Sequence, residues 1–166
     1  MQINSIKILR SRRRKRSVSA RVVKDILVVR APMEISETHL QKVVGELKAK
    51  IERKHLKDEL NKQENLTERA KEFNAQYFGN KLKINSIEYV ANQNSKFGCC
   101  NYTTGSIRIS HRIGAMPKWV RDYVIMHELA HLVEPNHSQA FWDIVNCYKL
   151  AERARGFLIA MGNQEE

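Results

Sequence analysis

The segment from residue 127 to residue 137 combines three imidazoles with one carboxylate at a spacing that can form a metal site. They are His127, Glu128, His131 and His137. Residues i and i+4 lie on one face of a helix, so His127 and His131 can converge on one metal ion. A catalytic zinc site has three protein ligands and leaves the fourth position open for water. The spacing therefore predicts that His127, His131 and His137 bind Zn²⁺ as a cofactor, with Glu128 as the catalytic base.

A structural zinc site is the alternative interpretation of the same motif. Such sites are usually closed by four ligands, often cysteines, and the sequence offers no obvious fourth ligand. None of Cys99, Cys100 and Cys147 has the CxxC spacing of a zinc knuckle. The pattern therefore favours a catalytic metal. We expect the three cysteines to be free thiols and the protein to be cytoplasmic.

The third histidine requires the chain to turn back after the helix that carries the first two. Pro135 biases Glu134 away from helical backbone angles, and Asn136 tolerates the unusual φ that such a bend can need. Asn136 can also cap the following helix, with Gln139 as its capping-box partner. We therefore expect a helix, a bend and a second helix around the metal.

The elements that position this motif can be predicted from hydrophobic periodicity. Apolar alternation indicates strands over 18–23 and 26–29, joined at Lys24-Asp25, and over 83–90, 96–101 and 106–110. Helical spacing indicates a helix from Ser36, either broken or continued over 57–65, and a second helix capped by Thr67. Further helices are expected over 117–133 and from 136–138 to Tyr148. Strands and helices in this order predict an α+β fold.

Length and charge set the domain organisation. The 166 residues suit one domain, with basic N-terminal strands in 1–32 and a catalytic core in 66–160. Residues 1–30 contain ten Lys or Arg and one acid, Asp25, which gives +9 of the formal net charge of +11. The run from Arg10 to Arg16 therefore predicts non-specific contact with nucleic acid, and a solvated strand end is the alternative. No apolar run approaches the ~18 residues of a membrane span.

Several segments resemble the YgjP-like metallopeptidases, which are related to the WLM and SprT-like zincins. The resemblance covers most of the chain: the N-terminal strand with Arg10-Ser11 and the basic residues after it, residues 77–82, 105–110 and 122–124, Pro117, and the block from His127 to Trp142. The family reads Trp-Gly-Ser-Cys where this chain has Phe97-Gly98-Cys99-Cys100. The resemblance implies a zincin-like fold, with a small, mostly antiparallel sheet packed against the metal-binding helix. It also implies three histidine ligands for zinc and a catalytic role for Glu128.

These residues predict a metallopeptidase that hydrolyses peptide bonds of a peptide or protein substrate with a zinc-activated water. Zinc would lower the pKa of its water, and Glu128 would accept the water's proton. Tyr123, Tyr148 and His111 are candidates for stabilising the oxyanion. The segment Ser106–Ser110 is a candidate edge strand for binding an extended peptide. The alternatives are a zinc-dependent hydrolase of nucleotides or other phosphate esters, and a nucleic-acid-binding protein with a structural zinc.

Overall fold

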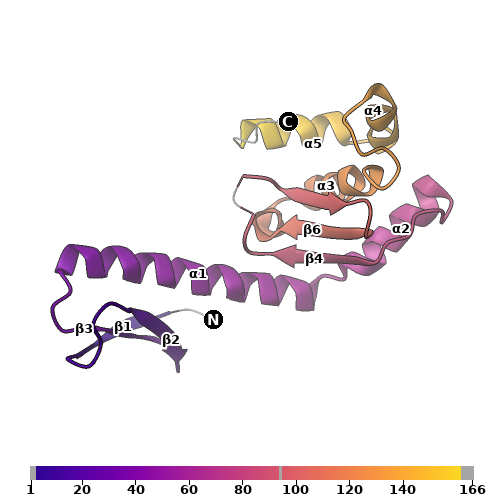
Figure 1. Cartoon of the computed structure of the whole chain (residues 1–166). Helices are drawn as coiled ribbons and strands as arrows, with labels where there is room; N and C mark the ends of the chain where they lie inside the picture. Colours follow the sequence, from indigo (N-terminus) through magenta and orange to yellow (C-terminus); the bar gives the residue numbers. More distant parts are fainter. Residues whose placement is uncertain (1–2, 94, 162–166) are drawn as a thin grey trace. The chain divides into compact units, whose positions relative to one another are not determined.

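The computed structural model describes residues 3–93 and 95–161. The chain divides into two compact units, Met1–Leu56 and Lys57–Glu166, and Figure 1 follows the elements along the sequence. The helix α1 (Glu37–Gln63) contributes its first part to one unit and its last part to the other. A single domain over 1–166 stays a prediction.

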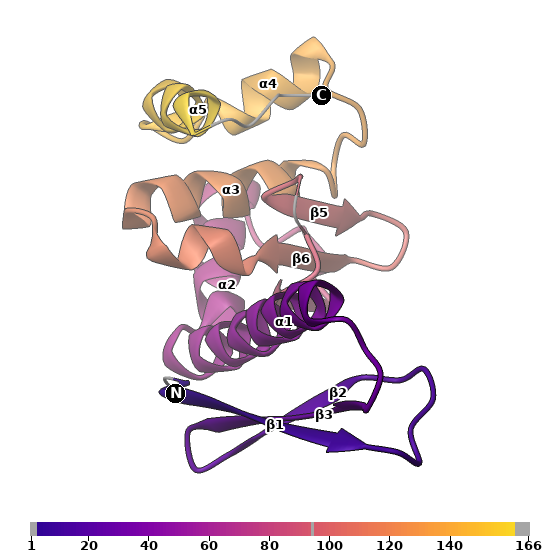
Figure 2. The ribbon, with the colours of Figure 1, turned by 90° about the vertical axis from the view of Figure 1, so that its left-hand side faces the viewer.

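The first unit is a three-stranded sheet covered by α1 on one face. Its strands are β1 (Ser5–Ser11), β2 (Ser19–Val23) and β3 (Ile26–Pro32), in the order β1-β3-β2. β3 lies parallel to β1 and antiparallel to β2, and Figure 2 shows α1 running along the sheet. Side chains from β3 and α1 form the core; they are Leu27, Val29, Ala31, Leu40 and Val44. Their burial fixes which face of the sheet the helix covers.

The predicted hairpin between β2 and β3 is confirmed. Its two connecting residues, Lys24 and Asp25, both have positive φ, at 47° and 63°. A two-residue turn that matches the twist of the strands needs positive φ at both positions, and Asn-Gly is the usual choice there. The tertiary pairing of the strands therefore imposes a backbone that Lys24 does not favour.

The helix α1 is continuous through the polar stretch for which the sequence left two alternatives. Ser36 caps it as expected, because the Ser36 Oγ accepts a hydrogen bond from the His39 N–H at 3.4 Å. At the other end Leu60 packs into the core of the second unit. The charged residues around it continue the helix without a break; Lys57, Asp58 and Glu59 are half-buried and Lys62 is exposed.

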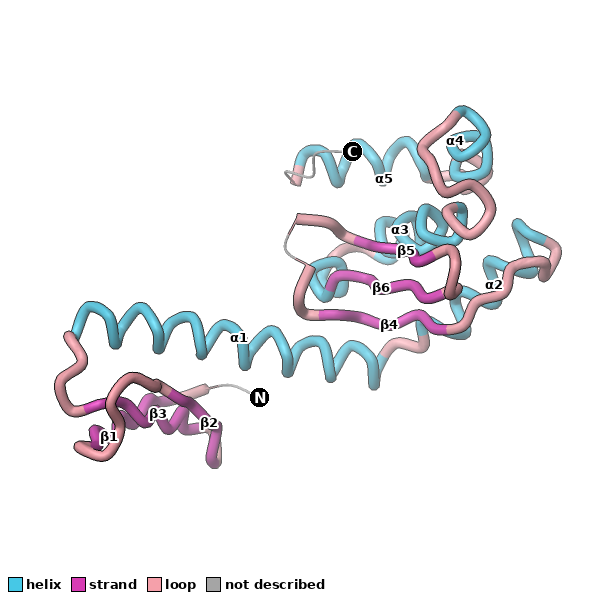
Figure 3. Tube along the Cα trace, in the orientation of Figure 1, coloured by secondary structure: helices cyan, strands magenta, loops and turns pink. Residues whose placement is uncertain are grey.

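The second unit contains the expected helices and a second three-stranded sheet (Figures 1 and 3). The elements are α2 (Leu66–Phe78), β4 (Ser86–Val90), β5 (Gly98–Asn101), β6 (Ser106–Ser110), the 3₁₀ helix η1 (His111–Ala115), α3 (Lys118–Ala130), α4 (Gln139–Val145) and α5 (Ala151–Ala160). The α+β class is confirmed. Both sheets are mixed, because each has one parallel and one antiparallel pair of strands.

The prediction that Ser106–Ser110 is an edge strand is wrong. The strand order is β4-β6-β5, so this segment, β6, lies in the centre and β5 lies at one edge. The opposite edge, at β4, is partly covered by Asn61 of α1. The Asn61 amide accepts from the Tyr89 N–H at 2.9 Å and donates to the Tyr89 carbonyl at 3.0 Å. Residues 98–101 of β5 therefore form the other edge of this sheet.

Two helix caps and one helix boundary also differ from expectation. Asn65, not Thr67, caps α2, because the Asn65 Oδ1 accepts from the Glu68 N–H. Ser138, not Asn136, caps α4 by accepting from the Phe141 N–H. The expected last helix ends at Val145, and α5 follows it as a separate helix that periodicity did not indicate.

The expected free thiols are confirmed, because Cys99, Cys100 and Cys147 form no disulfide. No helix in the described part of the chain is both long and apolar enough to cross a membrane.

Candidate metal centre

The three predicted histidines meet at one point in the second unit. His127 lies in the last turn of α3, and His131 follows directly as its C-cap residue in helical conformation. The chain then bends, and His137 comes back before α4 begins. The Nε2 atom of His137 lies 3.2 Å from the Nε2 of His127 and 3.2 Å from the Nε2 of His131. Helix, bend and second helix therefore assemble the triad as the spacing predicts.

Aromatic side chains of α4 hold the three imidazole rings in place. The Phe141 ring stacks on His131 with centroids 4.5 Å apart and meets His127 edge-on at 4.8 Å. The Trp142 ring stacks on His137 at 5.6 Å. Phe141 is fully buried, so its position is fixed by the core. The two aromatic residues thus confine the three imidazole rings to orientations in which their nitrogens can converge on one metal ion.

The protonation of the histidines also suits a metal. The carbonyl of Glu134 lies 3.3 Å from the Nδ1 of His131, so it accepts a hydrogen bond from Nδ1–H and leaves Nε2 with its lone pair. Burial, and secondarily the positive charge that His131 and His137 can carry, lowers the pKa of His127 to about 3. A neutral imidazole is the form that binds a metal.

The geometry fits a tetrahedral ion. Zinc–nitrogen distances of about 2.0–2.1 Å place two tetrahedral ligand atoms about 3.3 Å apart. The two Nε2 distances of 3.2 Å agree with this spacing. The ligand atoms of all three histidines lie within 4.8 Å of one another. The donor set, all nitrogen, suits zinc and other first-row transition metals.

Glu128 is buried between α3 and β5. It is 5% exposed, and its Oε2 atom has no hydrogen-bond partner among the described residues. Burial, against a smaller opposing effect of the positive charge of Lys96, raises the pKa of Glu128 to about 8. The carboxylate packs directly on the backbone of Gly98 in β5. A buried acceptor without a partner is rare in proteins and is typical of a group that acts on a ligand or a water.

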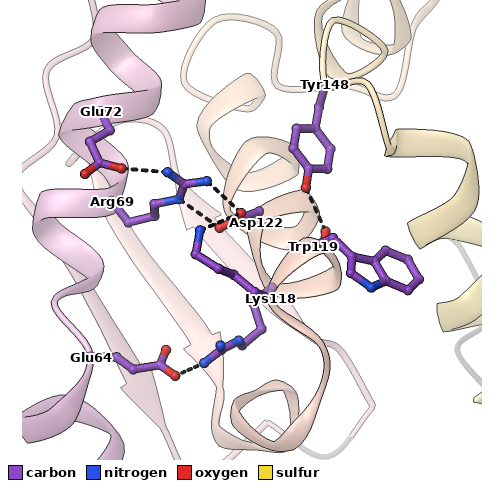
Figure 4. A network of polar contacts seen from close by, with 8 residues as sticks. Glu64, Arg69, Glu72, Lys118, Trp119, Asp122 and Tyr148 are labelled. Atoms are coloured by element: carbon purple, nitrogen blue, oxygen red, sulfur yellow. Dashed lines mark hydrogen bonds and ion pairs between the residues drawn. The ribbon is translucent and has the colours of Figure 1, made fainter.

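An ion-pair network anchors α3 to α2 (Figure 4). Arg69 donates to both carboxylate oxygens of the buried Asp122, from Nε at 2.8 Å and from Nη2 at 2.6 Å. Lys118 adds a third contact to Asp122 at 3.1 Å, and Glu72 accepts from Arg69 at 2.6 Å. Bidentate guanidinium–carboxylate pairs fix orientation as well as distance. The network therefore sets the position of the helix that carries His127.

The three candidates for oxyanion stabilisation lie in different surroundings. The Tyr148 hydroxyl donates to the Trp119 carbonyl at 3.1 Å, as Figure 4 shows. His111 is buried, with its Nδ1 3.3 Å from the Val90 carbonyl. The Tyr123 ring lies beside the His127 ring, with centroids 6.1 Å apart. The Tyr123 ring therefore lies next to the triad.

The family assignment follows from a comparison with known proteins. Residues 81–150 match the family model described as YgjP-like, metallopeptidase domain. This segment contains β4, β5, β6, α3 and α4, and with them the complete histidine triad. Residues 81–150 form a YgjP-like metallopeptidase domain.

A solved structure supports the fold of this YgjP-like domain. The crystal structure of the metallopeptidase zymogen of Pyrococcus abyssi abylysin aligns with a TM-score of 0.52 at 17% sequence identity. The alignment covers 61% of this chain and 100% of that chain. At this identity the likeness shows the fold alone. No curated protein matches the chain.

Sequence reasoning missed part of this YgjP-like site. The role of Gly98 depends on a contact with α3 that local periodicity does not indicate, although the Phe97-Gly98-Cys99-Cys100 segment stood out in the resemblance. Phe141 and Trp142 look like ordinary core residues at helical spacing. Their contacts with the imidazoles appear only once the bend at residues 131–138 is in place.

Proposed function

We propose that this chain is a zinc-dependent metallopeptidase with its catalytic core in residues 66–160. The observation that carries the proposal is the convergence of three histidine nitrogens within a domain of a metallopeptidase family. His127, His131 and His137 would hold the zinc ion. Glu128, directly after the first ligand, would be the catalytic base.

Zinc bound by three histidines lowers the pKa of a bound water towards ~7 and polarises a carbonyl group. The chain's own contribution is proton transfer by Glu128. Its Oε2 would accept a proton from the attacking water as the water oxygen bonds to the scissile carbonyl carbon. The same oxygen would return the proton to the amide nitrogen as the carbon–nitrogen bond breaks. This atom has no hydrogen-bond partner among the residues that the structure describes, which leaves it available for both transfers.

The peptide substrate would bind along β5. This strand lies at the edge of the sheet opposite to β4, and its first residue contacts Glu128. An extended peptide can add to such an edge through main-chain hydrogen bonds. The scissile bond would then lie beside the base without a large movement of the sheet. This arrangement favours an unfolded or extended peptide over a folded protein surface.

A substrate panel tests the proposal against its two rivals. The zinc-loaded protein should hydrolyse casein or quenched fluorogenic peptides, and 1,10-phenanthroline should abolish the activity. Cleavage of nucleoside triphosphates or bis(p-nitrophenyl) phosphate without peptide cleavage would support the phosphate-ester hydrolase instead. Loss of the fold on removal of zinc, with no hydrolysis of any substrate, would support a structural zinc in a nucleic-acid-binding protein.

A further inference from the structure

The first unit has an open sheet face that carries positive charge. Residues of β3 alternate, so that Leu27, Val29 and Ala31 point towards α1 and are buried. The other face has Ser5, Lys7 and Leu9 of β1, Ile26, Val28 and Arg30 of β3, and Ser19, Arg21 and Val23 of β2. Figure 2 shows α1 on one side of this sheet. Three of the nine residues are cations and none is an acid.

The strand register places these cations side by side. Val28 pairs with Lys7 on one neighbouring strand and with Arg21 on the other. Strands lie about 4.8 Å apart, so the two cations flank Val28 with their backbones about 10 Å apart. Arg30 comes two residues further along β3, on the same face. We call Lys7, Arg21 and Arg30 the cationic face.

The connection from β1 to β2 adds a second group of positive charges. We call four of its exposed residues the loop cations; they are Arg12, Arg13, Lys15 and Arg16. None of these four side chains, and none of the cationic face, has a hydrogen-bond or ion-pair partner within residues 3–93 and 95–161. Seven cations are therefore left without a counter-charge from the described residues.

Two other arginines of the predicted basic run have partners in the chain. Arg10 donates to the Glu37 carboxylate at 2.8 Å and to the carbonyls of Met33 and Ile35. Arg14 donates to the Ser17 carbonyl and hydroxyl. These contacts hold the end of β1 and the loop in place. The cations that are available to bind a ligand are therefore not the same set as the run from Arg10 to Arg16 that the sequence indicates.

We propose that the cationic face and the loop cations bind nucleic acid through its phosphate backbone. A polyanion matches seven unpaired cations gathered on one small unit. Residues 1–56 contain no Phe, Trp or Tyr, so base stacking is absent and the contact is independent of sequence. A membrane surface fits less well, because interfacial binding inserts protruding apolar or aromatic side chains. Here the apolar residues of this face lie among cations on the three strands.

Binding of the full-length protein to a fluorescein-labelled 20-mer, single-stranded and duplex, tests the proposal between 50 and 300 mM salt. With seven contacts the slope of log affinity against log salt is about −6 for duplex and about −5 for single strands. The triple variant Lys7→Gln, Arg21→Gln, Arg30→Gln should make the duplex slope about 3 units shallower and leave zinc content unchanged. Replacement of the four loop cations should make it about 4 units shallower.

The matched control removes the same charge from the same unit at another place. Lys42, Lys50 and Lys54 are exposed on α1, and their replacement by Gln should leave the slope unchanged. If the triple variant is unfolded by circular dichroism, Arg21→Gln alone should still reduce the duplex slope by about 0.9. Equal slopes for the face and control variants would overturn the proposal. It would also be overturned by no binding at 50 mM salt, or by binding only to phosphatidylserine vesicles.

Discussion

Gly98 of β5 and Glu128 of α3 pack so closely that no side chain fits between them. A Cβ atom built on Gly98 would lie 2.1 Å from the Glu128 Oε1 and 2.6 Å from its carboxyl carbon. Non-bonded carbon atoms approach only to about 3.5–4.0 Å at their optimum. The glycine is therefore needed here for space and not for an unusual φ. It lets the carboxylate lie flat against the edge strand.

Gly98→Ala should impair catalysis more than folding. The new methyl group would push Glu128 into another rotamer, and a misplacement of about 1 Å can cost about 100-fold in rate. We expect kcat to fall by about this factor while zinc content stays the same. Steady-state kinetics and elemental analysis of the same samples measure both quantities.

Two further variants identify the cause of that loss. Gly156→Ala in α5 is the matched control, because its Cβ would meet no atom within 4 Å, and it should keep native activity. Glu128→Asp shortens the carboxylate side chain, so adding Gly98→Ala to it should cost little further activity. A double variant that loses as much as the two single losses combined would contradict the steric explanation.

His137→Ala should weaken zinc binding by more than about 100-fold. Loss of a residue that only hydrogen-bonds to a metal ligand typically lowers metal affinity about 10–100-fold, and this change removes a ligand itself. His127 and His131 would remain, but two imidazoles from one helical turn leave half of a tetrahedral shell to water. Competition with a chromophoric chelator measures the affinity. His39→Ala, at an exposed position of α1, is the control and should bind zinc normally. Similar affinities for the two variants would exclude His137 as a ligand.

Arg69→Ala should destabilise the second unit by about 2 kcal/mol or more. The variant leaves the Asp122 carboxylate, 8% exposed, with Lys118 as its remaining described ionic partner. Lys71→Ala on the same helix breaks an exposed pair with Glu68 and should cost less than about 1 kcal/mol. Urea denaturation monitored by circular dichroism compares the two. Equal effects would show that the network of Figure 4 contributes no more than surface charges.

The thiols of Cys100 and Cys147 should react at very different rates. Burial, and secondarily the negative charge of Glu128, raises the pKa of Cys100 to about 12. Only the thiolate is nucleophilic, so about one molecule in 10⁴ is reactive at pH 8, and the rate should rise tenfold per pH unit. Cys147 is exposed. Iodoacetamide labelling followed by peptide mass spectrometry should modify Cys147 first, and faster labelling of Cys100 would contradict its burial.

The sequence predicted the local elements better than their partners in space. The spacing of His127, His131 and His137 was sufficient to predict the triad, because helix geometry and one bend fix their distances. By contrast, Ser106–Ser110 was placed at a sheet edge, and β5 occupies that edge. Alternation of apolar and polar residues predicts which side chains share a face of a strand. It does not predict which strands are its neighbours, because these depend on long-range pairing. The contact of Gly98 with Glu128 depends on the same pairing.

We infer that the three histidines hold zinc for a reaction in which Glu128 moves the proton. The most direct measurement compares native protein with Glu128→Gln, each assayed for zinc and for peptide hydrolysis on the same sample. The amide keeps the shape of the side chain but cannot accept the proton of water. Both proteins should contain about one zinc per chain, and only the native protein should cleave peptide. Native-like cleavage by Glu128→Gln, or absence of zinc from reconstituted native protein, would contradict the account.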